Sequence, residues 1–149
     1  MDKLTFRTAG EQDCEKILFF IRELAKYEKM EDEVVATPEL LREWIFEKQK
    51  AEVIFPTVDG QEVGFALFFH NFSTFLGRAG LYLEDLFILK EHRGKGYGKM
   101  LVEHAIGYAR TLSPCTLMLT SNPTRIAANE LYRASGFEQK ITNVYKMSL

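Results

Sequence analysis

Alternating and helical spacings of apolar residues divide the N-terminal part of the chain into a strand, a helix and a loop. Residues 4–8 alternate between apolar and polar side chains, which predicts a short strand. Gly10 breaks this pattern, and Asp13 stands where an N-cap would open the next helix. The acidic residues 28–33 have no period and predict a loop. Between these two breaks, apolar side chains recur at helical spacing: Ile17, Phe20, Ile21, Leu24 and Tyr27.

A second helix and a hairpin are expected next. Thr37 precedes Pro38, a pairing typical of a helix start, with threonine as the N-cap and proline at the first helical position. Residues 51–58 and 62–70 both have strand patterns. Asp59 and Gly60 between them form a dipeptide typical of a tight hairpin turn.

The C-terminal half continues the alternation of strands and helices. Ser113 and Pro114 predict the end of one helix, and Gly136 predicts the end of another. The predicted elements, in chain order, are a loop over residues 71–80, a strand over 81–89, a helix over 97–109, a strand over 115–119 with the apolar run typical of a central parallel strand, a turn over 121–124, a helix over 125–135 and one or more strands within 137–147.

This order of elements predicts one α/β (α+β) domain, residues 1–149, built around a single mixed sheet. A chain of 149 residues, 46% of them hydrophobic, is long enough to bury one core, and one domain is the expectation at this length. The 2 cysteines lie far apart in the sequence, which argues against a disulfide framework.

Charge and composition argue against several classes of function. Charged residues make up 27% of the chain but the net charge is only −2, so nothing favours nucleic acid or an anionic membrane as a partner. The longest apolar run, residues 65–69, is too short to span a bilayer, and the N-terminus lacks the order of a secretory signal. The 3 histidines have no partner at ligand spacing, so no metal site is indicated. We expect a cytoplasmic protein.

A glycine-rich turn joins the predicted strand over 81–89 to the helix over 97–109. Glycines allow positive φ and a close approach of the backbone to a ligand, and the free N–H groups of a helix's first turn form an anion site. Arg93, Lys95 and Lys99 add charge suited to a pyrophosphate. The P-loop and Rossmann patterns do not fit, because Lys99 precedes Met100 and occupies a position that the Rossmann pattern reserves for glycine. The alternative is a flexible basic turn without a ligand.

The turn resembles the acyl-CoA-binding signature of the GNAT acetyltransferases: an Arg or Gln, two residues, a Gly, one residue, and a Gly or Ala. Arg93, Gly96 and Gly98 occupy its fixed positions. The resemblance implies acetyl-CoA as the cofactor, with its pyrophosphate on the backbone amides of the turn and its pantetheine arm along the preceding strand. The residues expected at the cofactor are Phe87, Ile88, Leu89, Arg93, Gly94, Lys95, Gly96, Tyr97, Gly98 and Lys99.

Residues 127–137 resemble a second conserved block of this family, a helix containing Ala with a Tyr four residues before Gly-Phe. Tyr132 is that tyrosine, and the resemblance implies that its hydroxyl is the general acid for the leaving thiolate. The alternative is a tyrosine that packs its ring and leaves its hydroxyl in water. The resemblance implies the GNAT fold, a mixed and mostly antiparallel sheet of about six or seven strands flanked by about four helices.

Within the family, the N-terminal two-thirds is most similar to the diamine (spermidine/spermine) and thialysine N-acetyltransferases. This similarity rests on residues 24–33 and 82–85, and it implies a site for a small cationic amine. Glu84 would act as a base through water and Asp85 would help hold the substrate. Neighbours along a strand point to opposite faces, so these two carboxylates share a site only if the strand bulges. The remaining substrate residues expected are Tyr27, Glu28 and Phe75.

The chain departs from this branch at positions that concern substrate and cofactor. Phe75 stands where the branch tends to carry Trp, and residues 120–125 and 141–147 do not match it. Arg125 stands where an Asn of the family often contacts CoA, so Asn122 or Asn129 is expected to take that role.

These departures leave the substrate open. The first hypothesis is acetyl transfer to a primary amine of a di- or polyamine or of a lysine-like amino acid such as thialysine. The alternatives are another amine (a protein or peptide N-terminus or lysine, or an aminoglycoside) and a noncatalytic acyl-CoA-binding sensor, against which the presence of both Tyr132 and Glu84 counts. The resemblance also implies a homodimer.

Overall fold

The structure of the protein is a computed structural model that describes residues 3–112 and 115–149. Ser113 and Pro114, which predict a helix end, lie outside the described residues. The α-helices are α1 (Cys14–Tyr27), α2 (Pro38–Leu41), which continues as a π-helix over Arg42–Glu47, α3 (Tyr97–Arg110) and α4 (Ile126–Ala134). The strands are β1 (Leu4–Thr8), β2 (Glu52–Val58), β3 (Gln61–Glu62), β4 (Gly64–Phe69), β5 (Phe72–Ser73), β6 (Arg78–Ala79), β7 (Leu81–Ile88) and β8 (Leu117–Leu119).

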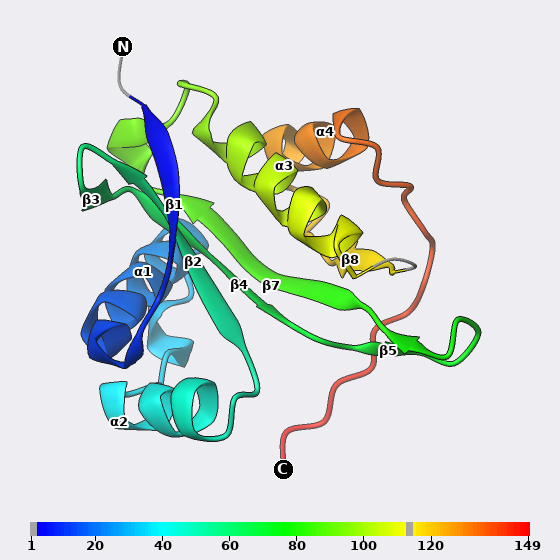
Figure 1. Cartoon of the computed structure of the whole chain (residues 1–149), viewed down its shortest axis with the longest axis horizontal. Coiled ribbons are helices and arrows are strands. Elements are labelled where there is room, and N and C mark those ends of the chain that lie inside the picture. The colour runs from blue at the N-terminus through cyan, green and yellow to red at the C-terminus, as the bar shows by residue number, and fades with distance from the viewer. Residues whose placement is uncertain (1–2, 113–114) are drawn as a thin grey trace.

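One six-stranded sheet organises the molecule, in the order β1-β2-β4-β7-β8 with β3 paired to β2. β7 and β8 run parallel, and the other pairs are antiparallel. Helices α1 and α3 lie on opposite sides of this sheet (Figure 1). The predicted mixed, mostly antiparallel α/β fold is confirmed.

The core is divided between the two faces of the sheet because successive residues of a strand point to opposite sides. Phe65 packs with Phe20 of α1, whereas the next residue, Ala66, packs with Leu101 of α3. Phe65, Phe20 and Leu101 are almost wholly buried, and burying one such side chain contributes roughly 1.5–3 kcal/mol. This two-sided core fixes β4 and its neighbour β7, on which the candidate site is built.

Two local signals from the sequence are confirmed. The N–H of Leu40 donates to the hydroxyl of Thr37 at 3.1 Å, so threonine caps α2 with Pro38 at its first position. Asp59 and Gly60 have φ of 50° and 78°, as the tight turn between β2 and β3 requires.

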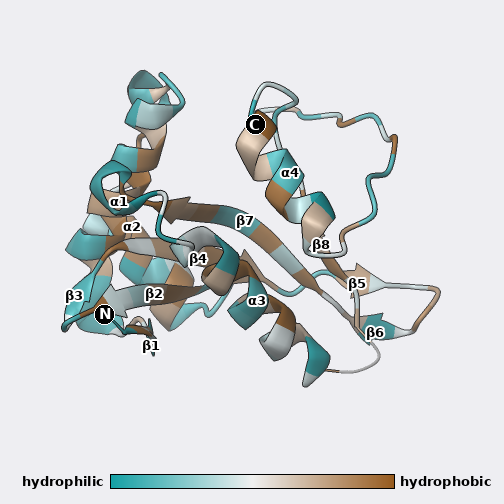
Figure 2. Ribbon diagram, turned by 90° about the horizontal axis from the view of Figure 1, so that it is seen from above, coloured by the Kyte–Doolittle hydropathy of each residue, from teal (hydrophilic) through white to brown (hydrophobic). Residues whose placement is uncertain are grey.

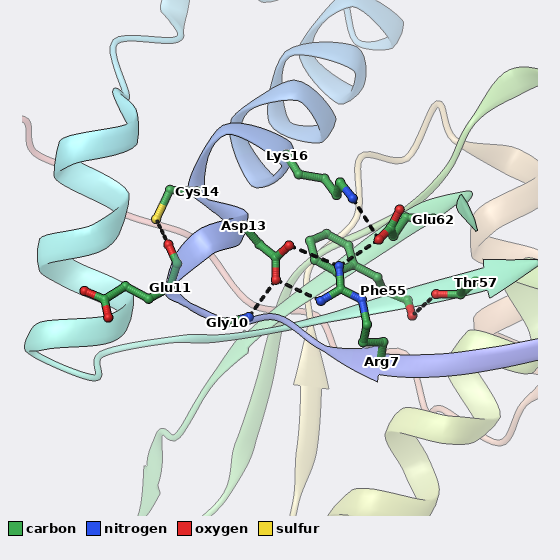
Figure 3. A network of polar contacts seen from close by, with 9 residues as sticks. All are labelled: Arg7, Gly10, Glu11, Asp13, Cys14, Lys16, Phe55, Thr57 and Glu62. Atoms are coloured by element: carbon green, nitrogen blue, oxygen red, sulfur yellow. Dashed lines mark hydrogen bonds and ion pairs between the residues drawn. The ribbon is translucent and has the colours of Figure 1, made fainter. Parts of the chain in front are cut away.

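Asp13 has a different role from the predicted cap of α1. Its side chain makes no capping bond to that helix. Instead it accepts hydrogen bonds from the N–H of Gly10 at 2.7 Å and from Arg7 at 2.9 and 3.1 Å (Figure 3). Arg7 also binds Glu62 at 2.7 Å and thereby joins β1, β3 and the start of α1. The hydrogen bond from Arg7 lowers the pKa of Asp13, because it favours the ionised carboxylate.

Two strand predictions need correction. Residues 71–80 were expected to be a loop, but β5 and β6 pair within them as a short antiparallel ribbon. Residues 115–119 were expected to be a central strand, but β8 is a three-residue edge strand and Met118 on it is 51% exposed. An apolar run does not distinguish a central strand from an edge strand, because sheet order depends on contacts far apart in sequence.

The strands predicted within residues 137–147 are absent, and this prediction is wrong. Residues 137–149 form no helix or strand, and they run away from α4 to the C-terminus (Figure 1). Hydrophobic and hydrophilic residues are interspersed along this tail (Figure 2). A β-like pattern becomes a strand only where its backbone finds a partner, and this tail pairs with no described strand. Its apolar side chains that remain exposed are Ile141, Val144, Tyr145, Met147 and Leu149.

Candidate active site

A β-bulge on β7 brings two carboxylates to one side of the sheet. Asp85 pairs with Leu67 and Leu83 with Phe68, so Glu84 is the extra residue of the bulge. Leu83 and Leu86 both pack in the core on the α3 side although they are three residues apart. Glu84 and Asp85 between them line the same cavity. β7 therefore has the bulge that these two neighbouring carboxylates need in order to share a site.

The sheet opens at the same point. The parallel pairing of β7 with β8 covers only Leu81–Leu83 and Leu117–Leu119. Beyond Leu83, β7 continues to Ile88 with no described strand paired on that side, so its backbone groups, apart from the Ile88 carbonyl that binds Arg93, are available to a ligand. The Tyr82 hydroxyl lies 3.1 Å from the Thr120 hydroxyl and ties the two strands together where they begin to separate.

An acidic cavity of about 200 Å³ lies at this opening. Its acidic side chains come from the bulge of β7 and from Glu28, which follows the last residue of α1. The full set of lining residues is Leu24, Glu28, Leu83, Glu84, Asp85, Leu86, Leu119, Thr120, Ser121, Asn122, Arg125 and Tyr132.

Asp85 has the most strongly perturbed carboxyl group of this cavity. Burial raises the pKa of Asp85 from 3.8 to about 7, with further increases from the negative charges of Glu84 and Glu28 and an opposing effect from Arg125. A carboxyl group with this pKa exchanges its proton near neutral pH, which suits a general base or a site for a cation.

A groove of about 320 Å³ runs beside the cavity along the glycine turn. Gly94 and Gly96 adopt φ of 78° and 82°, and the space where a Cβ would stand on either is open. The first backbone bond of α3 joins Met100 N–H to the Gly96 carbonyl, which leaves the N–H groups of Tyr97, Gly98 and Lys99 without a helical acceptor. These open amides with nearby cations fit the pyrophosphate of acetyl-CoA.

Arg93 is held at the edge of this groove. Its Nε donates to the Ile88 carbonyl at 2.9 Å, and its guanidinium lies over the rings of Tyr27 at 4.3 Å and Phe87 at 5.1 Å. One hydrogen bond and two aromatic rings therefore fix the orientation of the guanidinium and of its remaining N–H groups. The signature arginine thus joins the end of β7 to the end of α1.

Tyr132 lines both the cavity and the groove. It is 8% exposed, and burial raises the pKa of its hydroxyl while Arg125 opposes the rise, so the hydroxyl keeps its proton at neutral pH. The helix end fixes its ring. Gly136, at φ 103°, and Phe137 return hydrogen bonds to the carbonyls of Arg133 and Tyr132, and the Phe137 ring stands edge-on to Tyr132 at 5.9 Å. Tyr132, with its hydroxyl protonated, therefore lies where the two spaces meet.

The structure places the sequence-predicted residues as follows. The cavity contains Glu28, Glu84, Asp85, Asn122 and Tyr132. The groove contains Tyr27, Phe87, Ile88, Arg93, Gly94, Gly96, Tyr97, Gly98, Lys99 and again Tyr132. Four residues line neither space: Phe75, Leu89, Lys95 and Asn129.

Three of the predicted residues have informative positions. Phe75 is fully exposed near the tip of the β5–β6 ribbon. Asn129 donates to the Asn122 carbonyl at 3.1 Å and so supports the turn before α4, whereas Asn122 itself lines the cavity and not the groove. The sequence interpretation gave no role to Ser121 and Arg125, which line the cavity. The signal for Arg125 was its departure from the family's asparagine.

Neither a membrane-spanning helix nor a metal site is present among the described residues. Across residues 3–112 and 115–149, no helix is both long and apolar enough to cross a membrane. In the same ranges, no group of three or more His, Cys, Asp or Glu side chains is arranged to hold a metal ion.

Comparison with known sequences identifies the family. A model described as the acetyltransferase (GNAT) family matches residues 13–137. The chain is 34% identical to thialysine N-epsilon-acetyltransferase of Bos taurus over 139 residues, which cover 87% of this chain and 81% of the bovine protein. It is 30% identical to spermidine/spermine N(1)-acetyltransferase-like protein 1 of Homo sapiens over 126 residues, 79% of this chain but 18% of that protein.

Solved structures agree on the fold. An aminoglycoside acetyltransferase from an uncultured soil metagenomic sample superposes with a TM-score of 0.83 at 16% identity, covering 98% of this chain and 97% of that one. An aminoglycoside N-acetyltransferase in complex with CoA gives a TM-score of 0.75 at 17% identity, covering 99% of this chain and 96% of that one. The chain therefore belongs to the GNAT acetyltransferase family, whose members use acetyl-CoA, and its reaction is the transfer of an acetyl group to an amine.

Proposed function

We propose that the protein transfers the acetyl group of acetyl-CoA directly to a primary amine of a small cationic substrate, either a di- or polyamine or a lysine-like amino acid. The observation that carries this proposal is the meeting of the acidic cavity and the glycine-turn groove at Tyr132, which lines both. The acidic side chains suit a cation, and the open amides of the turn suit a pyrophosphate. Sequence similarity to thialysine and spermidine/spermine-type acetyltransferases supports the same substrate class.

The carboxylates of the bulge prepare the amine. An alkylamine has a pKa of about 10.4 and arrives as an ammonium ion, which has no lone pair for attack. Glu84 and Asp85 hold this cation and accept its proton, Glu84 through water and Asp85 with a pKa of about 7 that permits the exchange. Asp85 thus joins Glu84 as a candidate base.

Acetyl transfer then takes place in one displacement. The amine nitrogen attacks the thioester carbonyl carbon, a C–N bond forms, and the C–S bond breaks after the tetrahedral intermediate. Tyr132 donates its proton to the leaving thiolate of CoA. The ammonium substrate gives up two protons in all. One is balanced by the proton placed on the thiol, and the other leaves to solvent through the carboxylates. Holding the thioester and the amine together supplies much of the remaining acceleration.

The proposal is tested by measuring CoA thiol release from acetyl-CoA with a panel of amines. The panel contains putrescine, spermidine, spermine, thialysine, lysine, an aminoglycoside and a lysine-containing peptide. We expect selective turnover of the small aliphatic amines or amino acids. Turnover restricted to the peptide or the aminoglycoside would contradict the substrate class, and bound acetyl-CoA with no turnover of any amine would indicate a sensor.

A further inference from the structure

Arg125 is a charged residue of the acidic cavity to which the proposed function gives no role. Among the described residues that line the cavity, it is the only cation, opposite Glu28, Glu84 and Asp85. A site that served only to capture polycations would gain nothing from a fixed positive charge in its wall. The presence of both signs of charge therefore suits a ligand that carries a negative group as well as a positive one.

The guanidinium of Arg125 has unused hydrogen-bonding capacity. Its contact with the Glu28 carboxylate is 3.8 Å, which is too long for a hydrogen bond. Its Nε is buried and has no hydrogen-bond partner among the described residues. Its other contact is with the Tyr27 ring, whose centre lies 5.8 Å from the guanidinium carbon. Buried donors of this kind are normally paired. The guanidinium can therefore donate to an acceptor from a ligand, which the described residues do not supply.

Ser121 gives a second, independent indication on the same segment. Its hydroxyl is buried without a hydrogen-bond partner among the described residues, and the residue lines the same cavity. Both residues belong to the connection between β8 and α4. This wall of the cavity therefore offers donors, whereas β7 and the end of α1 offer carboxylate acceptors.

We propose that Arg125 binds a carboxylate of the substrate, so that the enzyme selects basic amino acids and discriminates against di- and polyamines. The reacting amine lies toward Glu84 and Asp85, and the carboxylate lies on the guanidinium, for which a bidentate ion pair is the favoured geometry. The far end of a basic amino acid carries an ammonium and a carboxylate, and the carboxylate pairs with Arg125. The far end of a diamine carries only an ammonium, which Arg125 repels. This inference rests on the proposed function, because it names the substrate of the same site.

Two matched substrate pairs test the inference. L-lysine and cadaverine differ only in the carboxylate, as do L-ornithine and putrescine. We expect the wild-type protein to have the higher kcat/KM for the amino acid of each pair. In Arg125→Gln, kcat/KM for the amino acids should fall about tenfold or more, mainly through KM, while that for the diamines should rise because the repulsion is removed. Arg133→Gln is the matched control, because Arg133 lies on α4 outside both spaces and its side chain contacts Gln139 at 3.4 Å.

The other outcomes separate this inference from the function on which it rests. Diamines preferred by the wild type, or an equal loss for both members of a pair in Arg125→Gln, would overturn the role of Arg125 and leave amine acetylation intact. A weaker affinity for acetyl-CoA in Arg125→Gln, measured by calorimetry, would overturn it as well, because Arg125 also lines the groove. Turnover of none of the four substrates, with only a lysine-containing peptide or an aminoglycoside acetylated, would overturn the proposed function itself.

Discussion

Tyr132 owes its position to residues that follow it in the sequence. Gly136 adopts a positive φ that closes α4, and this reversal returns the Phe137 ring onto Tyr132. The spacing of Tyr four residues before Gly-Phe is therefore a geometric requirement of one helix end. Burial keeps the hydroxyl protonated, as a proton donor to a thiolate requires.

Replacement of this hydroxyl tests the role of the residue. We expect Tyr132→Phe to lower kcat about tenfold or more with little change in the affinity for acetyl-CoA, since the lost interaction acts on the leaving group. Steady-state kinetics and calorimetry measure the two quantities. Tyr108→Phe is the control, because that ring packs on Phe68 away from the site. Unchanged turnover in Tyr132→Phe would remove the residue from its role.

Asp85 links the chemistry of the site to the stability of the fold. Its pKa is raised from 3.8 to about 7, so the folded state binds the proton more tightly than the unfolded state. The stability associated with this proton is fully present below about pH 4 and is lost as pH rises through about 7. Above that pH the fold carries the whole cost of the buried carboxylate.

The neutral substitution Asp85→Asn should therefore stabilise the protein at pH 8 while it lowers activity. We expect a gain of roughly 2–4 kcal/mol in the free energy of unfolding at pH 8, which shrinks toward zero as the pH is lowered to about 4. Urea unfolding at several pH values measures the gain. Glu103→Gln, on the exposed side of α3, is the control. A gain that did not depend on pH would contradict the assignment of the charge cost to Asp85.

At the scale of elements, the site depends on irregularities in regular structure. The bulge turns Glu84 and Asp85 to one side, and the end of pairing between β7 and β8 frees the backbone of β7. The glycine turn then replaces side chains by open amides where α3 begins. Each irregularity weakens the sheet or the helix start locally, and each opens space for a ligand.

The glycine turn is tested with a pair of matched substitutions. Gly96 and Gly60 have φ of 82° and 78°, and at both the space for a Cβ is open. Alanine should therefore strain both turns to a similar degree. We expect Gly96→Ala to weaken acetyl-CoA binding several-fold in calorimetry, and Gly60→Ala to leave it unchanged. Equal affinities in the two variants would contradict the assignment of the pyrophosphate to this turn.

Most elements could be predicted from the sequence because their signals are local. Helical spacing, the Thr37 cap and the turn at Asp59 and Gly60 each depend on a few neighbouring residues. The edge position of β8 and the unpaired tail could not be predicted, because they depend on which strand edges are free in three dimensions. The sequence showed that the two carboxylates can share a site only if the strand bulges, but it could not show that the bulge occurs at Glu84. The position of a bulge depends on the register with the partner strand.

The candidate site was predicted where its residues follow a motif. Tyr132, Arg93 and the glycines lie at the cavity or groove as the motifs imply. Ser121 belongs to no motif and Arg125 only departs from one, and their significance depends on donors left without partners among the described residues. Such a property is invisible in the sequence.

At the scale of the whole molecule, the tail after α4 is the least integrated part of the described chain. Its side chains of Ile141 and Val144 are 100% and 77% exposed, and β8 offers an unpaired edge. Burial of these apolar groups against a second copy would remove them from water. This exposure supports the homodimer that the family resemblance predicts.

Sedimentation equilibrium tests the dimer. We expect a mass of twice the 17.2 kDa of one chain, and a shift toward the monomer in the double variant Ile141→Lys, Val144→Lys. Glu103→Lys, on the exposed side of α3, takes one site from −1 to +1 and so adds the same positive charge as the two apolar-to-lysine changes; it is the control. A wild-type protein that stays monomeric at micromolar concentration would contradict the prediction.

We propose that acetyl transfer takes place where the acidic cavity meets the glycine-turn groove. The most direct test is a crystal structure of the protein with CoA and L-lysine. We predict the pyrophosphate on the amides of Gly96 and Gly98, the CoA sulfur within hydrogen-bond reach of the Tyr132 hydroxyl, and the side-chain amine of lysine against Glu84 and Asp85. A CoA molecule bound with its sulfur away from Tyr132, or an amine bound outside the cavity, would contradict the account.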